Sequence, residues 1–569
     1  MFQLENLLRN EFFPAELPEC FSTNDLADNA SEAISATKEF NRSCSVPIKF
    51  SGYKSESSRR KFSIPNPYHY IKAANVIVEN SEHIFNVLRK SVYSLTAPVY
   101  KLPDFTEPYA KKVVTVADTK KMIESQYNDN RYEIRLDISS FFDSIYTHSI
   151  PWAIHGIAQA KRMRNDDSLL GNILDQHMRA MNYNQTNGIL VGNAVSRIIS
   201  EILLCTVDAQ IRQKFPDISC CRYVDDYYIY TKDSTQIQEI ISHVRTYLAQ
   251  YELSFNENKI QINESPFLYG QPWVEEVKQY IHLPPEVFLS KLIMEFNTHK
   301  DIKIIKYGLK VLSCYKYTPK NWGAMQSRFL NLWVRFPSLA NRIYPILMVN
   351  QEFLKKSTLK QAIYSVIDEA ILLHRDQELI WAIWFIKVFD IHISQTYVVN
   401  VLSSKNDIAK IIILDIISKR NLSTSKRIKQ ELIRLRDDLI SLDSDNGKND
   451  ALMWSQHWLL AYEADLNKWL TIDGVPFQIA RKNQFFQKLI KNKVKFYDPD
   501  FSYEQPKCRE MGHEYATRAE LYSVVSKLKK LIATHTGNNN KHTSDAFNDK
   551  EKQLYEKLVD ILENDRTVY

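Results

Sequence analysis

The sequence predicts an α+β protein in which a mixed first half is followed by an all-helical second half. Glycine is scarce, at 12 of 569 residues, and such scarcity favours long helices with few tight turns. Strand-like runs rich in β-branched and aromatic residues lie at 132–145 and 218–231, whereas amphipathic helical patterns with short polar breaks dominate after residue 275. A chain of 569 residues also exceeds one hydrophobic core, so we expect two or more packed units.

We expect four parts along the chain. The first is polar, rich in aromatic residues and proline, and of mixed periodicity, which is typical of an irregular α/β region. In the third part, residues 276–533, the polar breaks between helices are spaced as in the stacked helix pairs of a HEAT-like solenoid, although no clean repeat period is present. The last is a polar linker and a charged helix. The parts span residues 1–130, 131–275, 276–533 and 534–569.

Composition limits the function classes. Hydrophobic residues at 44% and charged residues at 25% are the balance of an ordinary globular protein. With a net charge of only +6, any phosphate-binding surface has to be a local groove. The seven cysteines show no CxxC pair, which argues against a disulfide framework and against zinc. No secretory signal or membrane-spanning apolar stretch is present, so we expect a cytoplasmic protein with no membrane partner.

Two segments of the second part have a clear local pattern: a strand that runs into a helix, and a loop that leads into a buried helix. In YEIRLDISSFFDSI (132–145), strand alternation gives way to helix, with Asp137 at the end of the strand. In 188–212, a Gly-x-x-x-Gly turn leads into an apolar helix on which Arg197 and Glu201 stand at i, i+4.

The run ISCCRYVDDYYIYT (218–231) predicts a β-hairpin whose turn presents Asp225 and Asp226. Paired aspartates at a turn are commonly surface residues, so this alternative stays open for the pair alone. Two adjacent acids among apolar and aromatic residues nevertheless repel each other, and a cation would remove that penalty.

Nucleotidyl transfer supplies a reason for such a cluster. It uses two divalent cations about 3.5 to 4 Å apart, one activating the attacking hydroxyl and the other holding the triphosphate. Magnesium prefers carboxylate oxygens and keeps some of its waters, so a few aspartates suffice. Asp137, Asp225 and Asp226 are therefore the predicted metal ligands and catalytic residues, for two Mg²⁺ ions that Mn²⁺ could replace.

Segments around these residues resemble the motifs of reverse transcriptases, in the family's order. LDISSFFDSI (136–145) resembles the first palm motif, GILVGNAVSR (188–197) the Gly-turn motif, and YVDD (223–226) the metal-binding hairpin. LSFNENKIQI (253–262) and RRKFSIPN (59–66) resemble the family's lysine and finger motifs. The resemblance implies a fingers-like region up to residue 130, a palm at 131–275, and an RNA-directed DNA polymerase-type enzyme that binds dNTPs and nucleic acid.

The same resemblance assigns roles outside the metal site. Arg60 would grip the incoming triphosphate, for which a guanidinium fork is suited, although a solvated basic cluster is the alternative. Lys259 would lie beside the pyrophosphate leaving group, or be merely exposed. Phe142 would be the aromatic gate that selects deoxynucleotides, with Phe141 or Phe142 filling the core. Gly192 and Tyr223 would also contact substrate.

One departure from the family pattern concerns the template. Where many reverse transcriptases have Pro-Gln-Gly, this chain has Leu190, Val191 and Gly192. The missing glutamine helps to organise the nascent base pair, so templated copying is in doubt. Segment YTHSIPW (146–152) and the GNxxSRIIxE pattern (192–201), followed by a helical C-terminal half, resemble the abortive-infection branch of bacterial reverse transcriptases.

That branch implies anti-phage defence, template-independent synthesis and priming from a protein hydroxyl. Tyr53, in a polar stretch, and the terminal Tyr569 are the candidate priming residues. Three functions remain open: a defence polymerase in the bacterial cytoplasm, a templated reverse transcriptase of a mobile element with an RNA template or associated RNA, and a catalytically silent helical scaffold. The apolar helical surface also suggests a homo-oligomer.

Overall fold

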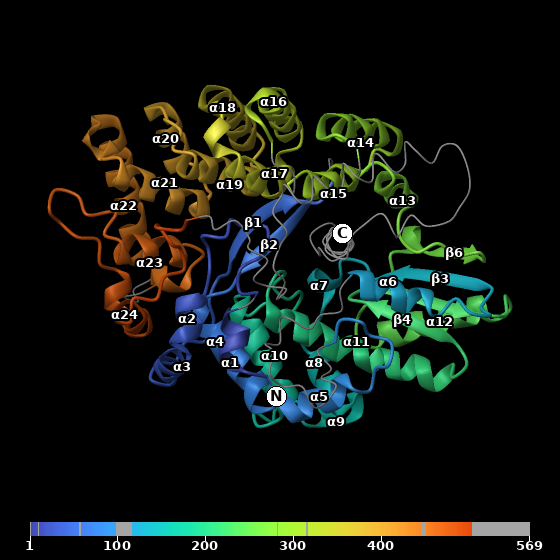
Figure 1. Ribbon diagram of the computed structural model, residues 1–569. Coiled ribbons are helices and arrows are strands. Elements are labelled where there is room, and N and C mark those ends of the chain that lie inside the picture. Colours follow the sequence, from blue (N-terminus) through green and yellow to red (C-terminus); the bar gives the residue numbers. More distant parts are fainter. Residues whose placement is uncertain are drawn as a thin grey trace, which may run out of the picture.

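A computed structural model describes residues 2–9, 11–55, 58–97, 116–281, 283–313, 317–444 and 451–502. The predicted linker and last helix, including Tyr569, lie outside these residues. Within them the predicted combination of an α/β part and a helix-dominated part is confirmed (Figure 1).

The N-terminal part contains a two-stranded antiparallel hairpin surrounded by helices. In the hairpin, Ile48 faces Ile64 and Tyr53 faces Arg59. The side chain of Asn66 accepts a hydrogen bond from the backbone N–H of Tyr68 and thereby starts the helix that follows the second strand. The elements are α1 (Leu4–Arg9), α2 (Asn24–Asp28), α3 (Ala30–Lys38), β1 (Ile48–Tyr53), β2 (Arg59–Ile64), α4 (Pro67–Glu79), α5 (Ser81–Leu88) and α6 (Val116–Glu124).

The next part is built on a four-stranded antiparallel sheet with strand order β4-β5-β3-β6. Its long helix α11 begins where the side chain of Asn193 accepts a hydrogen bond from Ser196 N. The elements are β3 (Tyr132–Asp137), α7 (Phe141–Ser144), α8 (Ser149–His155), α9 (Ile157–Arg162), α10 (Leu170–Met181), α11 (Ala194–Lys214), β4 (Ser219–Tyr223), β5 (Asp226–Thr231), α12 (Gln236–Ala249), the 3₁₀ turn η2 (Glu257–Lys259) and β6 (Gln261–Glu264).

The described residues after 271 form helices stacked in two layers (Figure 1). Helices α14, α16, α18, α20 and α22 make the outer layer, and α15, α17, α19, α21 and α23 make the inner one. The bounds are α13 (Pro272–Lys278), α14 (Pro285–His299), α15 (Ile302–Leu312), α16 (Pro319–Arg335), α17 (Ala340–Val349), α18 (Lys356–Leu372), α19 (Asp376–Val388), α20 (Gln395–Leu402), α21 (Asp407–Lys419), α22 (Lys426–Ser444), α23 (Trp458–Leu466) and α24 (Gln484–Lys491).

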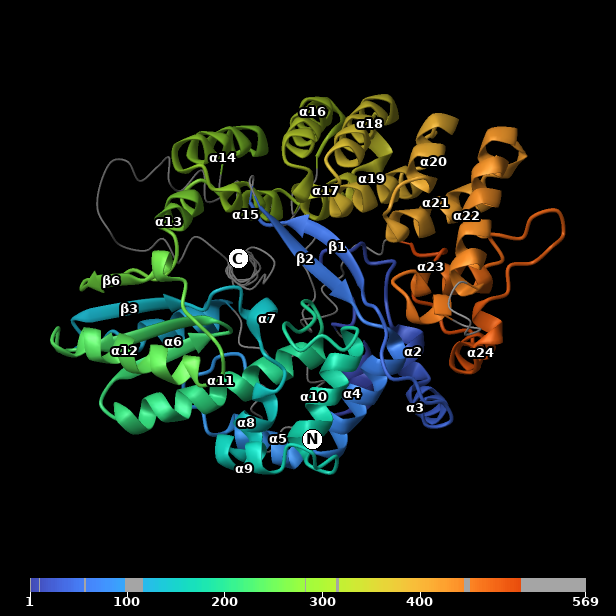
Figure 2. The same ribbon diagram turned by 180° about the vertical axis from the view of Figure 1, so that it is seen from behind.

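The start of α19 holds the β1–β2 hairpin against the helical part. Both terminal guanidinium nitrogens of Arg59 donate to the buried carboxylate of Glu378, at 2.5 and 2.6 Å. Backbone amides of β1 also donate to this helix, Ser51 N to Asp376 Oδ2 at 2.8 Å and Tyr53 N to Gln377 Oε1 at 3.0 Å. Seen from behind in Figure 2, the hairpin spans the distance between the helical layers and the N-terminal helices.

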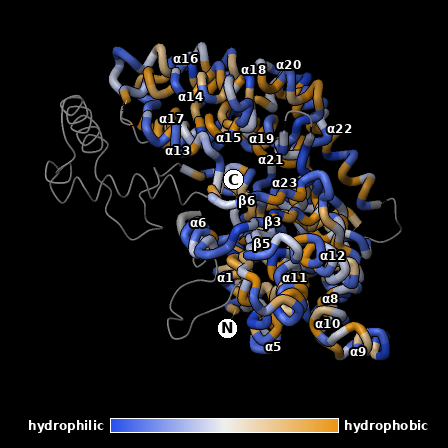
Figure 3. Tube along the Cα trace, turned by 90° about the vertical axis from the view of Figure 1, so that its right-hand side faces the viewer, coloured by the Kyte–Doolittle hydropathy of each residue, from blue (hydrophilic) through white to orange (hydrophobic). Residues whose placement is uncertain are grey.

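One hydrophobic core runs through all three parts of the described chain. Figure 3 shows apolar and polar segments alternating along the helices, as expected for amphipathic helices packed in layers. None of the described helices combines the length and apolarity that crossing a membrane would take.

Two details of the predicted palm differ from the sequence expectation. Asp226 is the first residue of β5 rather than part of the turn, which consists of Val224 and Asp225. Arg197 and Glu201 do not pair with each other, because Arg197 binds Glu11 at 2.9 Å whereas Glu201 points into the core toward Arg222.

Candidate active site

The acidic hairpin has a two-residue turn with a strained backbone. Tyr223 pairs with Asp226, so only Val224 and Asp225 connect β4 to β5. Val224 has a φ of 54°, which is costly for a β-branched side chain. Such strained residues cluster at functional sites, where the surrounding structure has to hold them in place.

The adjacent strand completes the acidic group. Asp137 at the end of β3 is the cross-strand partner of Asp226 at the start of β5. Directly opposed residues in an antiparallel sheet project from the same face, with Cβ atoms about 4.5 to 5.5 Å apart. The backbone N–H of Ile138 donates to the carbonyl of Asp225 at 3.3 Å. The three aspartates predicted from the sequence are therefore brought together.

Burial makes the acidic pair electrostatically costly. It raises the pKa of Asp226 to about 7, and the charges of Asp225 and Asp137 add to this shift while Lys259 and Lys303 oppose it. Burial also raises the pKa of Asp225, with Asp137 adding to the shift and Arg60 and Lys259 opposing it. A cation held by these carboxylates would favour their ionised forms.

Lys259 lies at the acidic group itself. Its ammonium donates to both carboxylate oxygens of Asp137, at 3.0 and 3.1 Å. The Lys259 side chain is 56% exposed, so it can leave Asp137 at little cost. The structure thus places Lys259 within reach of the aspartates, from a 3₁₀ turn beside β3.

A buried hydrogen-bond network behind the turn was not predicted from the sequence. Arg222, fully buried, binds Glu201 at 3.0 Å and Asp208 at 2.8 Å. It also donates to the carbonyl of Val224 at 2.8 Å. The N–H of Val224 donates to Thr96 Oγ1 at 3.2 Å, and that hydroxyl donates to Glu201 at 2.6 Å. The backbone N–H and the carbonyl of Val224 are thus both held by hydrogen bonds to side chains.

The Gly turn packs against both the N-terminus and the hairpin β1–β2. Gly192 has a φ of 100°, and a Cβ there would lie 2.9 Å from a side-chain carbon of Pro14. Glycine is therefore needed for both conformation and space. The carbonyl of the half-buried Val191 accepts a long hydrogen bond, 3.4 Å, from Ser63 N of β2.

The two phenylalanines of the first motif differ in burial. Phe141 is 3% exposed and belongs to the core, whereas Phe142 is half-buried and packs at its edge. The carbonyl of Phe142 accepts a hydrogen bond from Ile189 N, which links it to the Gly turn. Tyr223, opposite Asp226, is half-buried on the same face of the sheet as the acids.

Arg60 lies on β2, opposite Gly52 of β1. It is exposed, and its charge acts on both Asp225 and Glu16. Tyr53, the described candidate for priming, is the neighbouring position of β1, with the ammonium of Lys306 5.4 Å from its ring centroid. The β1–β2 hairpin therefore places the charge of Arg60 where it acts on the acidic group.

The donor set fits divalent cations. Three aspartates meet at one end of the sheet, where burial and mutual repulsion raise the pKa of Asp225 and Asp226 despite the nearby cations, and hard oxygen donors suit divalent ions. Their oxygens do not converge to mutual ligand distance. Among described residues only Glu276, Glu295 and His299 do so, on α13 and α14. That second group contains none of the predicted ligands.

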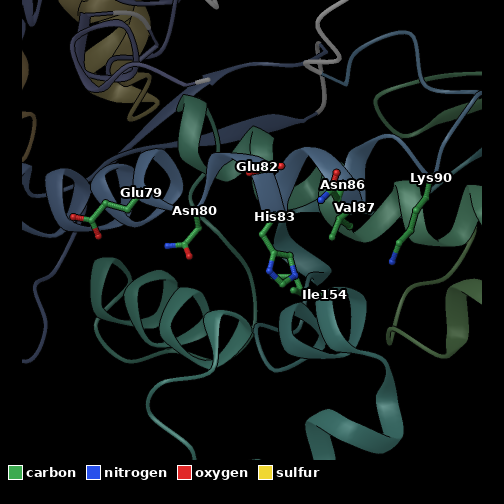
Figure 4. A pocket seen from close by; sticks show the side chains of 8 residues that line it. All are labelled: Glu79, Asn80, Glu82, His83, Asn86, Val87, Lys90 and Ile154. Carbon is green, nitrogen blue, oxygen red and sulfur yellow. The ribbon is translucent and has the colours of Figure 1, made fainter.

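A surface pocket elsewhere on the molecule is unrelated to this group. It has a volume of about 480 Å³ and lies between α5 and α8, with His83, Glu82, Lys90 and Ile154 among its lining residues (Figure 4). None of the predicted site residues lines it.

Comparison with known proteins identifies the region. Residues 56–278 match the family model for reverse transcriptase (RNA-dependent DNA polymerase). No curated protein matches the chain. Among solved structures, apo telomerase from Candida tropicalis truncated from its C-terminal domain is 12% identical with a TM-score of 0.28, and the match covers 40% of this chain and 51% of that one. The chain thus spans about half the length of that structure.

Two further telomerase structures are similarly distant. Apo telomerase from Candida tropicalis is 10% identical with a TM-score of 0.28, covering 75% of this chain and 76% of that one. Telomerase from Candida albicans in complex with a TWJ fragment of telomeric RNA is 12% identical with a TM-score of 0.26, covering 60% and 65%. Structural similarity this low does not indicate a shared function.

Proposed function

Because residues 56–278 form a reverse-transcriptase domain, that is, a nucleotidyltransferase of the RNA-directed DNA polymerase type, we propose that the protein polymerises deoxynucleotides in defence against phage. The observation that carries the polymerase assignment is the direct opposition of Asp137 and Asp226, with Asp225 adjacent. A chain without chemistry to perform has no reason to keep three acids at this cost.

We assign two Mg²⁺ ions to the three aspartates, with Mn²⁺ as a substitute. When bound, they lower the pKa of the attacking hydroxyl and neutralise charge on the triphosphate. Arg60 grips the triphosphate, and Lys259 moves from Asp137 to the leaving pyrophosphate. Phe142, at the edge of the core beside the Gly turn, closes the space that a 2′-hydroxyl would need. Gly192 and Tyr223 line the substrate side.

The defence assignment rests on the resemblance to the abortive-infection branch and on the structural roles of two residues in the matching motif. In the GNxxSRIIxE pattern, Asn193 starts α11 and Glu201 supports the acidic turn through Arg222. The two-layered helices that follow the palm are proposed to be a HEAT-like repeat domain, as in that branch. Within this reading, residues 1–130 are the fingers-like region and 131–275 the palm.

Synthesis without a template and priming by a tyrosine belong to the same proposal. Val191 replaces the glutamine that organises the nascent base pair, and its carbonyl is engaged by β2. Tyr53 lies one position from the partner of Arg60. A phenol there attacks the α-phosphate of the first dNTP, its proton leaves to solvent, an O–P bond forms and pyrophosphate is released. Tyr569 is the second candidate.

The test is incubation of purified protein with Mg²⁺ and labelled dNTPs, with and without an RNA template, followed by separate proteinase and nuclease digestion. We expect label to remain with the protein until proteolysis and to need no template. Mass spectrometry then locates the nucleotide-bearing peptide, with Tyr53→Phe as the matched variant. Product that migrates as free DNA before proteolysis refutes self-priming and leaves the polymerase assignment intact.

The same assay separates the alternatives. Synthesis only with added RNA favours a templated mobile-element enzyme, and no synthesis under any condition favours a helical scaffold. Exposed leucines at the end of α18, Leu372 at 76% and Leu373 at 49%, support the proposed homo-oligomer. Light scattering of the purified protein measures its mass, and a monomeric mass contradicts this part of the proposal.

A further inference from the structure

Helix α15, outside the reverse-transcriptase domain, carries two lysines on one face. Lys303 and Lys306 are one turn apart, so their side chains project the same way. Both are half-buried, and neither forms an ion pair with another described residue. The opposite face of the helix, with Ile304, Ile305 and Leu309, is buried in the core. The packing of α15 therefore fixes the backbone positions from which the two lysines project.

Lys306 contacts the β1–β2 hairpin, and the charge of Lys303 is felt at the acidic group. Lys306 lies over the ring of Tyr53 on β1, 5.4 Å from its centroid, beside the strand position opposite Arg60. Lys303 acts electrostatically on Asp226 at the start of β5. In Figure 1, α15 lies next to the upper end of the β1–β2 hairpin, on the side of α13. One helix thus brings cations to both the fingers-like hairpin and the acidic group.

Positive charge is crowded at this place. Burial lowers the pKa of Lys306, and the charges of Arg342 on α17 and Lys303 lower it further, while Glu16 and Asp301 oppose the shift. Glu16 is a weak counterion, because burial raises its own pKa despite the nearby charges of Arg60 and Lys306. An anionic ligand would relieve the repulsion among these cations.

We propose that Lys303 and Lys306, with Arg342 on the neighbouring helix α17, form a phosphate-binding surface by which the helical part completes the active site. This rests on the proposed function, which supplies two sources of phosphate: the triphosphate of the dNTP and the backbone of the bound strand. Lysine binds phosphate as a point charge and needs no exact orientation, which suits a strand that moves during synthesis.

The experiment measures binding without catalysis. The full-length protein is titrated with a labelled single-stranded DNA oligonucleotide in Ca²⁺, by fluorescence anisotropy at several salt concentrations. For Lys303→Ala/Lys306→Ala we expect about tenfold weaker binding, and a logarithmic salt slope shallower by about 1.4, since each phosphate contact on single strands contributes about 0.7. Lys303→Arg/Lys306→Arg keeps the charge and should bind normally.

Lys320→Ala is the matched control, because Lys320 is exposed at the start of α16 in the outer layer. A second arm titrates a dNTP alone. Weakening of the oligonucleotide only assigns the surface to the strand, and weakening of the dNTP only assigns it to the triphosphate. Unchanged affinity for both ligands in the folded alanine variant overturns the proposal. Failure of polymerisation with binding intact would instead refute the proposed function and leave this surface standing.

Discussion

The guanidinium of Arg222 donates a hydrogen bond to the carbonyl of Val224, 2.8 Å away, from a position with no solvent exposure. Val224 is the strained residue of the acidic turn, and its N–H is held in turn by Thr96. The conformation of the turn between β4 and β5 is thus fixed by hydrogen bonds to the buried Arg222 and to Thr96. The aspartates keep their place because the polar groups of the turn have fixed partners.

Removing one of these partners should reduce catalysis more than stability. In Thr96→Val, the buried N–H of Val224 loses its acceptor, which costs about 1 to 3 kcal/mol of unfolding free energy. Displacement of the acidic turn should lower kcat about tenfold or more while the KM for dNTP changes little. Steady-state incorporation kinetics and chemical denaturation measure the two effects.

Ser91→Ala is the control for that variant. The Ser91 hydroxyl donates to Asp208 at 2.6 Å in the same network but does not touch the turn. We expect similar destabilisation with kcat unchanged. Equal losses of kcat in both variants would mean that Thr96 acts only through stability.

Neutralising the proposed metal ligands should abolish synthesis without unfolding the chain. Asp225→Asn and Asp226→Asn remove charge but preserve shape, so nucleotide incorporation should fall by several orders of magnitude. The melting temperature should not fall, because both carboxyls are already costly when ionised. Normal polymerisation by both variants would refute the assignment.

Opening the edge of the core at Phe142 should change sugar selection. Phe142→Ala is expected to admit ribonucleotides, because it removes the ring that we propose to abut the 2′ position. The measurement is the ratio of kcat/KM for dNTP over rNTP. Phe141→Leu, which alters the buried neighbour, is the control and should keep the preference. An unchanged ratio in Phe142→Ala would place the gate at another residue.

Two buried histidines should make the fold sensitive to acid. Burial lowers the pKa of His69 to about 3 and that of His177 to about 4. Below the usual value of about 6.5, the unfolded chain binds protons that the folded chain does not. Unfolding free energy should therefore fall as pH decreases from 6.5 toward 4, by up to about 1.4 kcal/mol per pH unit for each histidine.

His177→Gln removes one of these groups. Its unfolding free energy should depend less steeply on pH over that interval, as measured by urea denaturation at several pH values. A slope equal to that of the unchanged protein would show that His177 does not contribute.

The site was predictable from sequence where it depends on local pattern. Alternation around Asp137 and around the acidic pair predicts strands, and the motif order predicts that they meet. The two-residue turn was not predictable, because Val224 adopts a conformation that its side chain disfavours. Glu201 and Arg222 were missed as partners, because their contact arises only when α11 packs under the sheet.

Lys303 could not be predicted from sequence motifs either, because its place near the site depends on long-range packing. Its proximity to Asp226 depends on how α15 packs across the molecule, and no local pattern encodes that arrangement. The two helical layers could be expected from amphipathic periodicity alone, but their register against β1 could not. Polar contacts such as Ser51 with Asp376 set that register.

The ion pair between Arg59 and Glu378 limits which fragments of the protein can fold by themselves. A two-stranded ribbon is at best marginally stable in water by itself, and β1–β2 gains its support from α19, where a Cβ on Gly52 would already lie 3.0 Å from Gln377 Oε1. Truncation after residue 278 would strip this ribbon of its amide acceptors and leave Arg59 without its carboxylate. The smallest unit that folds therefore includes helices far downstream, and a fragment that ends at residue 278 should be incompletely folded.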